Sequence, residues 1–177
     1  MSLSLLRLRQ HVAILAILLI TVLAAIILPA RSRFLWIVYN ASGSAPLGFY
    51  RVDHRLPARG DTVAIRPSKT LQYLLDTHAV LPPKIPLLKR VAGIGGDRIC
   101  RSSGVVFVNG DAIAEALERD QNGRPLPVWE GCFTLFEGQF FVVQPHPYSF
   151  DSRYFGPVSE CQIIGVAHPI WTWNPDE

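Results

Sequence analysis

Residues 40–50 read NASGSAPLGFY, and this stretch separates two very different parts of the chain. A long apolar run precedes it, and short alternating segments of the kind found in strands follow it. Within it, Ser42–Pro46 (SGSAP) has the composition of a tight turn, and residues 48–53 (GFYRVD) alternate as a strand does. The stretch therefore predicts a turn carrying two hydroxyl groups at the start of a β-rich domain.

The apolar run covers residues 12–28 (VAILAILLITVLAAIIL), and Thr21 is its one polar side chain. As a helix it would be roughly 25 Å long, at the short end of what spans a bilayer. A cleaved signal peptide is the alternative, but its apolar region is shorter, and Leu28-Pro29-Ala30 is a poor cleavage site. We expect residues 12–29 to be a transmembrane anchor, residues 1–11 a cytoplasmic tail, and residues 30–177 a domain outside the membrane.

Composition and cysteine spacing exclude several classes of function. The net charge is +3, and the lysine and arginine residues form no basic block. The chain is therefore not expected to bind nucleic acid. The cysteines are Cys100, Cys132 and Cys161, and no pair has the spacing of a zinc site, so we expect no metal. In a domain outside the membrane we expect a Cys100–Cys132 disulfide and a free Cys161; three buried, inert thiols are the alternative.

Beyond the turn, the pattern predicts a mainly β domain with one short helix. The helix is expected over residues 69–79, with Ser68 as its N-cap, and Asn109-Gly110 predicts a type I′ hairpin. Residues 115–127 and 145–154 are expected to be loops. The expected strands are residues 48–53, 62–66, 86–94, 97–100, 105–108, 112–114, 133–136, 139–144, 162–166 and 171–173.

The hydroxyl of Ser44 is a candidate nucleophile, but a serine hydroxyl reacts poorly until a base takes its proton. The sequence contains no GxSxG nucleophile elbow. A serine–lysine pair is one known arrangement, and a histidine base remains open. The candidate bases are His54, His78, His146, His168 and Lys89.

Lys89 is the unusual candidate, because it interrupts the apolar strand expected over residues 86–94 (PLLKRVAGI). Neighbours on a strand point to opposite faces, so either Lys89 or Arg90 can face inward. Burial would lower the pKa of an inward-facing lysine and make its neutral amine a usable base. The alternative is a structural lysine whose amine reaches the surface.

The other polar groups near these positions suit supporting roles. The hydroxyl of Ser42 and the backbone N–H of Ser44 are candidate donors to the oxyanion of an acyl transfer. Ser149 is a candidate to orient the lysine amine. Asp151 and Arg153 can pair to fix the loop, or form an ordinary surface salt bridge of little energetic value.

Four segments together resemble the type I signal peptidase family. They are SGS at Ser42–Ser44 with Pro46, GDTV at residues 60–63, LLKRVAGIGGD at residues 87–97 and SFDSRYFG at residues 149–156. The closer likeness is to the TraF-type peptidases of conjugal transfer, because NASGSAPLGFYRV and GRPLPVWEGC (residues 123–132) are similar to their segments. Two positions depart from the family pattern: Ala45 stands where the family usually has methionine, and Gly95 stands where it usually has proline.

The resemblance implies a signal-peptidase-like β domain on the periplasmic side of the inner membrane, behind a single anchor. It implies cleavage of precursor proteins, either the pilin precursor or signal-peptide-bearing proteins, and in some members pilin cyclisation. No metal, nucleotide or other cofactor is implied. The implied roles are nucleophile for Ser44, general base for Lys89, oxyanion donor for Ser42, support of Lys89 for Ser149, and structural support for Asp151 and Arg153.

We therefore expect a membrane-anchored serine endopeptidase of conjugal transfer. A housekeeping signal peptidase I is an alternative, although the chain has one anchor and no large inserted subdomain. A non-enzymatic bitopic adaptor, whose β domain docks a secretion or conjugation partner, is a second alternative. It would explain the anchor and the β pattern but would give no reason for Lys89.

Overall fold

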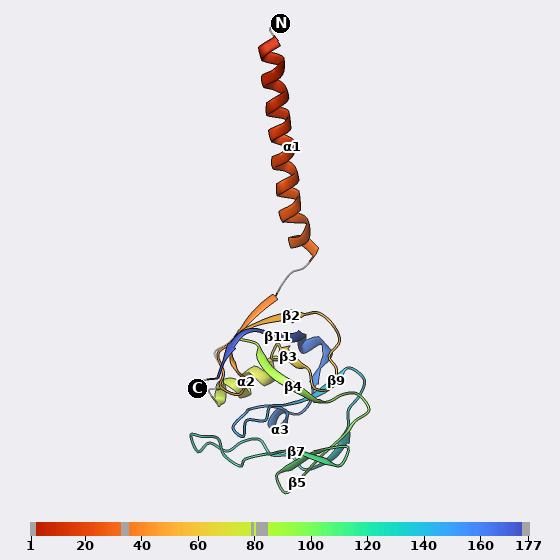
Figure 1. Cartoon of the computed structure of the whole chain (residues 1–177). Coiled ribbons are helices and arrows are strands. Elements are labelled where there is room, and N and C mark those ends of the chain that lie inside the picture. The colour runs from red at the N-terminus through yellow and green to blue at the C-terminus, as the bar shows by residue number, and fades with distance from the viewer. Residues whose placement is uncertain (1–2, 33–35, 79, 81–84, 175–177) are drawn as a thin grey trace. The chain divides into compact units, whose positions relative to one another are not determined.

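The computed structural model describes residues 3–32, 36–78, 80 and 85–174, in two compact units, residues 1–35 and 36–177 (Figure 1). The first unit contains the helix α1 (Leu3–Ser32). The side chains of residues 25–28, in the expected anchor, lie outside the described residues. Within the part of the chain that is described, no helix is both long and apolar enough to cross a membrane.

The second unit is mainly β, as the sequence predicts, and its described strands form two antiparallel sheets. The seven-stranded sheet has the order β1 (Trp36–Asn40), β2 (Leu47–Asp53), β11 (Ile163–Trp173), β3 (Thr62–Ile65), β4 (Leu87–Gly93), β9 (Gln139–Val143) and β10 (Val158–Ser159). The four-stranded sheet has the order β7 (Asp111–Glu115), β6 (Val105–Val108), β5 (Arg98–Ser102) and β8 (Gly131–Thr134).

β4 is a central strand, paired with β3 on one side and β9 on the other. Leu87, Leu88, Lys89 and Val91 on this strand are all buried, although neighbouring side chains point to opposite faces of the sheet. A strand that is buried on both faces has a nearly continuous apolar sequence, rather than alternating polar and apolar residues. Because both faces of β4 are buried, a lysine on this strand lies inside the domain.

Two expected strands prove to be one. The structure joins residues 162–166 and 171–173 in the long strand β11, whose register with β2 shifts between Pro169 and Trp171. A proline is tolerated in a sheet at such a bulge, so Pro169 does not end the strand as the sequence pattern suggests. β1 was not predicted, and β8 begins two residues before the expected strand at residue 133.

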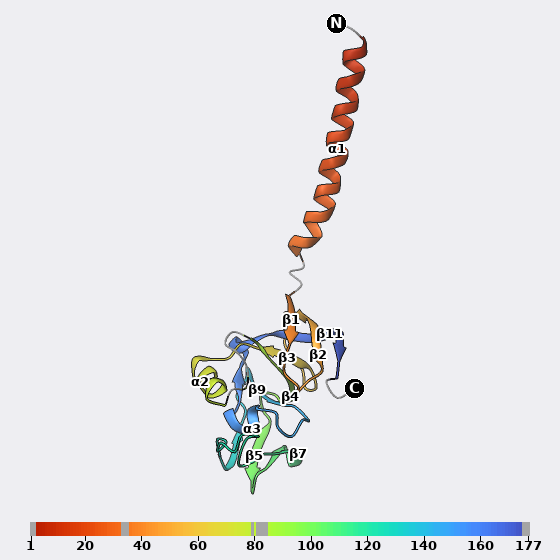
Figure 2. The same cartoon turned by 90° about the vertical axis from the view of Figure 1, so that its left-hand side faces the viewer.

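The expectation of one short helix is also wrong, because the domain contains three helical segments in its described residues. α2 (Lys69–Thr77) is the predicted helix, and the Ser68 side chain accepts the Leu71 N–H as its N-cap. α3 (Ser152–Phe155) lies in the expected loop, where Asp151 supplies the N-cap. A 3₁₀ turn, η1 (Glu160–Gln162), precedes β11. In Figures 1 and 2, α3 lies between β9 and the four-stranded sheet.

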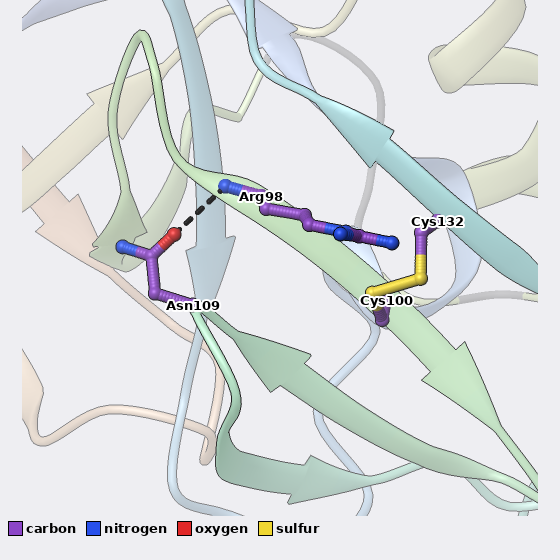
Figure 3. The surroundings of a disulfide bond; sticks show 4 residues. All are labelled: Arg98, Cys100, Asn109 and Cys132. Carbon is purple, nitrogen blue, oxygen red and sulfur yellow. Dashed lines mark hydrogen bonds between the residues drawn. A yellow bond between two sulfur atoms is a disulfide. The ribbon is translucent and has the colours of Figure 1, made fainter.

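The four-stranded sheet carries the predicted hairpin and disulfide. Asn109 and Gly110 both have positive φ, 54° and 96°, as a type I′ turn requires. Cys100 on β5 and Cys132 on β8 lie opposite each other in register and form the expected disulfide (Figure 3). Cys161 is a free, exposed thiol, so the alternative of three buried thiols is wrong.

Thiol counting tests this arrangement. In unfolded, non-reduced protein we expect one alkylated cysteine per chain, and three after reduction, because the disulfide protects two sulfurs. Mass spectrometry after alkylation gives both counts, and the Cys161→Ser variant should show no label before reduction. Three labelled cysteines in protein prepared without reductant would contradict the pairing.

Candidate active site

The Ser44 hydroxyl is positioned by the turn between β1 and β2, and the buried side chain of Asn40 organises that turn. Asn40 Nδ2 donates hydrogen bonds of 3.0 Å to the carbonyl oxygens of Ser42, Ala45 and Pro46. Its Oδ1 accepts the backbone N–H of Ser42 at 3.1 Å and the Ser42 hydroxyl at 3.0 Å. One amide side chain thus holds the turn on both sides of Ser44.

Lys89 is turned inward from β4, and only 2% of its surface is exposed. Its Nζ donates to Ser44 Oγ at 3.0 Å and to Ser149 Oγ at 2.8 Å. The neighbouring Arg90 is exposed and donates to the carbonyl oxygen of Gly60. The strand alternation therefore buries the lysine and exposes the arginine, so the alternative of a lysine that reaches the surface is wrong.

Burial sets the protonation of this amine. Removal from water disfavours the ammonium form and lowers the pKa of Lys89 from 10.5 to about 8. The negative charge of Asp151 opposes that shift, and the positive charge of Arg153 adds to it. A substantial fraction of Lys89 is therefore neutral near physiological pH, which a general base requires.

Asp151 and Arg153 form a buried pair rather than a surface salt bridge, since they are 0% and 2% exposed. Arg153 Nε lies 2.9 Å from Asp151 Oδ1, and Arg153 Nη2 lies 2.8 Å from Oδ2. Burial tends to lower the pKa of Arg153, but the hydrogen bonds and charge of Asp151 outweigh it and raise that pKa. Two planar groups joined by two hydrogen bonds fix each other's orientation.

This pair organises the loop that carries Ser149. Arg153 Nη2 also donates to the carbonyl oxygens of Gln144, His146 and Ser149, at 3.0–3.2 Å. Asp151 Oδ2 accepts the backbone N–H of Gln144 at 3.0 Å. The guanidinium therefore ties together the loop backbone that leads to Ser149, whose hydroxyl contacts Lys89.

Ser42 lies beside the candidate nucleophile, with 3.5 Å between the two hydroxyl oxygens. In this structure its hydroxyl donates to Asn40 Oδ1. Ser42 thus lies next to Ser44, and its hydroxyl is bonded to Asn40.

The histidines make other contacts, and among the described residues none hydrogen-bonds to Ser44. His54 and His168 lie against Ile164 O and Asp53 Oδ2, at 2.8 and 3.2 Å. His78 pairs with Asp120, and His146 accepts the backbone N–H of Tyr148. Lys89 is therefore the basic group that the structure places on Ser44.

A cleft of about 510 Å³ opens over these groups. Ser42, Ser44, Lys89 and Ser149 line it, together with α2's C-terminal His78 and the loop at residues 117–126. A cavity of this size with convergent polar groups is suited to binding part of a ligand. Within the described residues, no three acidic, histidine or cysteine side chains gather in a way that would hold a metal ion.

Comparison with known proteins identifies the family. Residues 8–173 match the sequence profile of the family described as signal peptidase, peptidase S26. The chain belongs to this family. Family membership supports a serine peptidase and confirms the resemblance seen in the sequence.

Similar proteins of this family include conjugal-transfer proteins. A probable conjugal transfer protein TraF from Sinorhizobium fredii is 33% identical over 148 residues, 77% of each chain. A plasmid transfer protein TraF from Escherichia coli is 36% identical over 91 residues. This match covers 49% of the present chain, which spans about half (51%) of the length of that relative. A signal peptidase I structure from Enterococcus faecalis shares 23% identity, with a TM-score of 0.39, over 64% of this chain and 98% of that one.

Sequence reasoning assigned no role to Asn40 or Gln144, although both lie at the site. Gln144 is buried, and its Nε2 donates to the Leu88 carbonyl at 3.3 Å, next to Lys89 in the strand. The signal for Asn40 was its position two residues before Ser42, since asparagine side chains often bond to backbone two residues on. Gln144 ends an apolar strand and gave no comparable signal.

The Asn40→Asp variant tests the role of the amide in the turn. A carboxylate keeps the size but cannot donate to three carbonyl oxygens, so we expect unfolding free energy to fall by about 1–3 kcal/mol. Urea unfolding in detergent, followed by tryptophan fluorescence, measures this. Ser42→Ala is the control, because it loses one hydroxyl hydrogen bond, worth about 0.5–1.5 kcal/mol. An Asn40→Asp protein as stable as the unmodified chain would contradict the assignment.

Proposed function

We propose that this chain is a membrane-anchored serine endopeptidase of conjugal transfer, with Ser44 as nucleophile and Lys89 as general base. The observation that carries the proposal is the contact of a buried amine with the Ser44 hydroxyl, 3.0 Å from nitrogen to oxygen. A serine hydroxyl needs a base within hydrogen-bond reach, and a neutral lysine can act as that base. A non-enzymatic adaptor would give no reason to bury this amine, because burial destabilises its charged form.

In the first step the neutral Lys89 amine takes the proton of Ser44 Oγ, and the oxygen attacks the scissile carbonyl carbon. The carbonyl π pair moves to the oxygen, which becomes an oxyanion. In this proposal the Ser44 backbone N–H and the Ser42 hydroxyl, whose oxygen lies 3.5 Å from Ser44 Oγ, donate to it. Throughout, Ser149 Oγ accepts from a remaining N–H of Lys89 and keeps the amine lone pair on Ser44.

In the second step the oxyanion collapses, the C–N bond breaks, and the Lys89 ammonium protonates the departing amine. The acyl group is now an ester on Ser44, and Lys89 is neutral again. A water molecule then attacks the ester, with Lys89 as its base, which releases the acid and restores the serine. An amine in place of water would form an amide, which is the route to cyclisation of a pilin.

We place the domain, residues 30–177, in the periplasm, with residues 12–29 as its anchor in the inner membrane and residues 1–11 in the cytoplasm. The apolar run and the Cys100–Cys132 disulfide support this topology, because disulfides persist in oxidising compartments. The substrates are precursor proteins at the membrane surface, such as a pilin precursor. Support for this substrate class comes from relatives described as plasmid and conjugal transfer proteins.

The Lys89→Arg variant tests the base. A guanidinium keeps the charge but holds its proton near neutral pH, so we expect kcat/KM to fall at least about 100-fold. Lys89→Ala should lose about as much activity as Ser44→Ala, and the double variant no more, because the two act as a unit. Arg90→Lys is the matched control, since this exposed neighbour should be replaceable without loss. A folded, substantially active Lys89→Arg protein would return the base to a histidine.

The pH dependence has a definite sign. Lys89 acts only as the neutral amine, and its pKa is lowered to about 8, so the rate should rise with pH below about 8 and level off above it. Initial rates of precursor cleavage between pH 6 and pH 10, with protein stability checked at each pH, measure this profile. A rate that levels off below pH 7 would indicate an imidazole base instead.

Removing residues 1–29 tests the anchor. The remaining chain contains both sheets and every candidate site residue, so it should fold and cleave soluble peptides at an unchanged rate. Cleavage of precursors embedded in vesicles should drop, because enzyme and substrate no longer share a membrane. Circular dichroism checks the fold. An unfolded truncated protein would show that the removed segment belongs to the domain core.

A further inference from the structure

A buried arginine, Arg101 on β5, has no part in the cleavage steps described above. Its side chain points to the same face of the four-stranded sheet as Ile99, and it is 4% exposed. Within the described residues no carboxylate forms a salt bridge with Arg101, and its Nε has no hydrogen-bond partner. Burial of a charge without a counter-ion is costly, so the stability of the domain gives no reason for this arginine.

The guanidinium of Arg101 is directed at one backbone carbonyl, that of Arg153. Arg101 Nη1 donates to the Arg153 carbonyl oxygen at 3.0 Å, and Trp129 Nε1 donates to the same oxygen at 2.9 Å. The guanidinium also lies over the Trp129 ring, 5.9 Å from its centroid, and reaches the Pro127 carbonyl oxygen at 3.5 Å. Two side chains, one on β5 and one just before β8, thus donate to a single carbonyl oxygen.

The sequence explains why the Arg153 carbonyl is open to side-chain donors. It lies in α3, and a carbonyl oxygen in an α-helix accepts the backbone N–H four residues later. Here that residue is Pro157, which has no N–H. The N–H of Gly156, three residues later, bonds to the Ser152 carbonyl instead. The Arg153 oxygen is therefore satisfied by side chains from other elements.

Arg153 connects these two donors to the candidate active site. Its Nη2 donates to the Ser149 carbonyl oxygen at 3.2 Å, and Ser149 Oγ accepts from Lys89 Nζ at 2.8 Å. Arg101 is therefore linked to the Lys89 amine through consecutive hydrogen bonds of 3.2 Å or less. A displacement of α3 would move Ser149 and with it the direction of the Lys89 lone pair.

The Cys100–Cys132 disulfide lies beside the residues that carry the two donors (Figure 3). Arg101 follows Cys100 on β5, and Trp129 lies three residues before Cys132. The ladder between β5 and β8 pairs Cys100 with Cys132 and Arg101 with Gly131. A covalent link at this point limits the movement of the two donors relative to each other.

We propose that Arg101 and Trp129 are positioning residues of the peptidase, which hold the Arg153 carbonyl and thereby keep the Ser149 hydroxyl on the Lys89 amine. The inference rests on the proposed peptidase function and adds two residues that are not among those lining the cleft. A small displacement of a catalytic group slows the chemical step without weakening the binding of substrate. The expected effect of losing either donor is therefore on kcat rather than on KM.

The Arg101→Met variant tests this role, with precursor cleavage by full-length protein in detergent as the readout. Methionine removes the buried charge, and Trp129 still satisfies the Arg153 carbonyl, so we expect the unfolding free energy to stay the same or rise. We nevertheless expect kcat to fall about 10- to 100-fold at an unchanged KM. A merely structural arginine would give the opposite pattern, with lower stability and an unchanged kcat in the folded protein.

Two further variants complete the cleavage arm. Trp129→Phe removes the indole N–H but keeps a ring to pack on Phe133 and Phe141, so it should also lower kcat at an unchanged KM. Arg98→Met is the matched control, because it makes the same substitution at an exposed position of the same strand and should leave kcat unchanged. If folded Arg101→Met protein cleaves with the kcat of the unmodified protein, the inference is wrong.

A second arm does not depend on catalysis. The chain has three lysines, Lys69, Lys84 and Lys89, so lysine-selective carbon-13 labelling gives few side-chain signals, and the loss of one in Lys89→Arg assigns it. The midpoint of the Lys89 titration is then measured by NMR in full-length protein. If Arg101 acts through Ser149, Arg101→Met should shift this midpoint in the same direction as Ser149→Ala does.

The two arms separate the failure of this inference from the failure of the proposed function. A common shift in Arg101→Met and Ser149→Ala protein supports the positioning role even if no precursor is cut, in which case the proposed peptidase function fails alone. A midpoint that stays in place or moves the opposite way in folded Arg101→Met protein overturns the inference, whatever the cleavage arm shows. An equal shift in Arg98→Met protein overturns it as well.

Discussion

The amine of Lys89 lies inside the domain, held between the hydroxyls of Ser44 and Ser149 and almost completely removed from water. Desolvation of this amine is the constraint on which the site depends, because it lowers the pKa of Lys89 to about 8. β4 provides the burial, because residues that point to both of its faces are buried, while β3 and β9 pair with its two edges. The same arrangement that gives the fold its core thus prepares a neutral amine next to a serine.

A buried amine is useful only if its partners are fixed, and two separate devices fix them. Asn40 holds the turn of Ser44 through three carbonyl oxygens, and the Asp151–Arg153 pair holds the loop of Ser149. These devices lie far apart in the sequence of the second unit, before β2 and after β9. Tertiary structure brings both to Lys89 on β4, so the geometry of the candidate site and the stability of the domain are coupled.

Local patterns predicted the mainly β class, the Asn109-Gly110 hairpin and the Ser68 cap, because each depends on a few adjacent residues. The order of the strands could not be predicted, since it depends on pairings between residues far apart, and Pro169 concealed the continuity of β11. Lys89 was conspicuous as a charge in an apolar run, whereas Asn40 showed only its spacing from Ser42, and Gln144 acts through a backbone contact that no spacing reveals. The buried state of Asp151 and Arg153 likewise required the structure, because the same two residues on a surface would look identical in sequence.

The central claim is that Ser44 forms a covalent acyl intermediate through the Lys89 amine. Acid-quenched reactions with a cleavable precursor, analysed by intact-protein mass spectrometry and peptide mapping, test it most directly. The account predicts an added mass equal to the acyl half of the substrate, attached to Ser44, and absent from folded Lys89→Ala protein. An adduct on another residue, or one that forms on Ser44 at the same rate without Lys89, would contradict it.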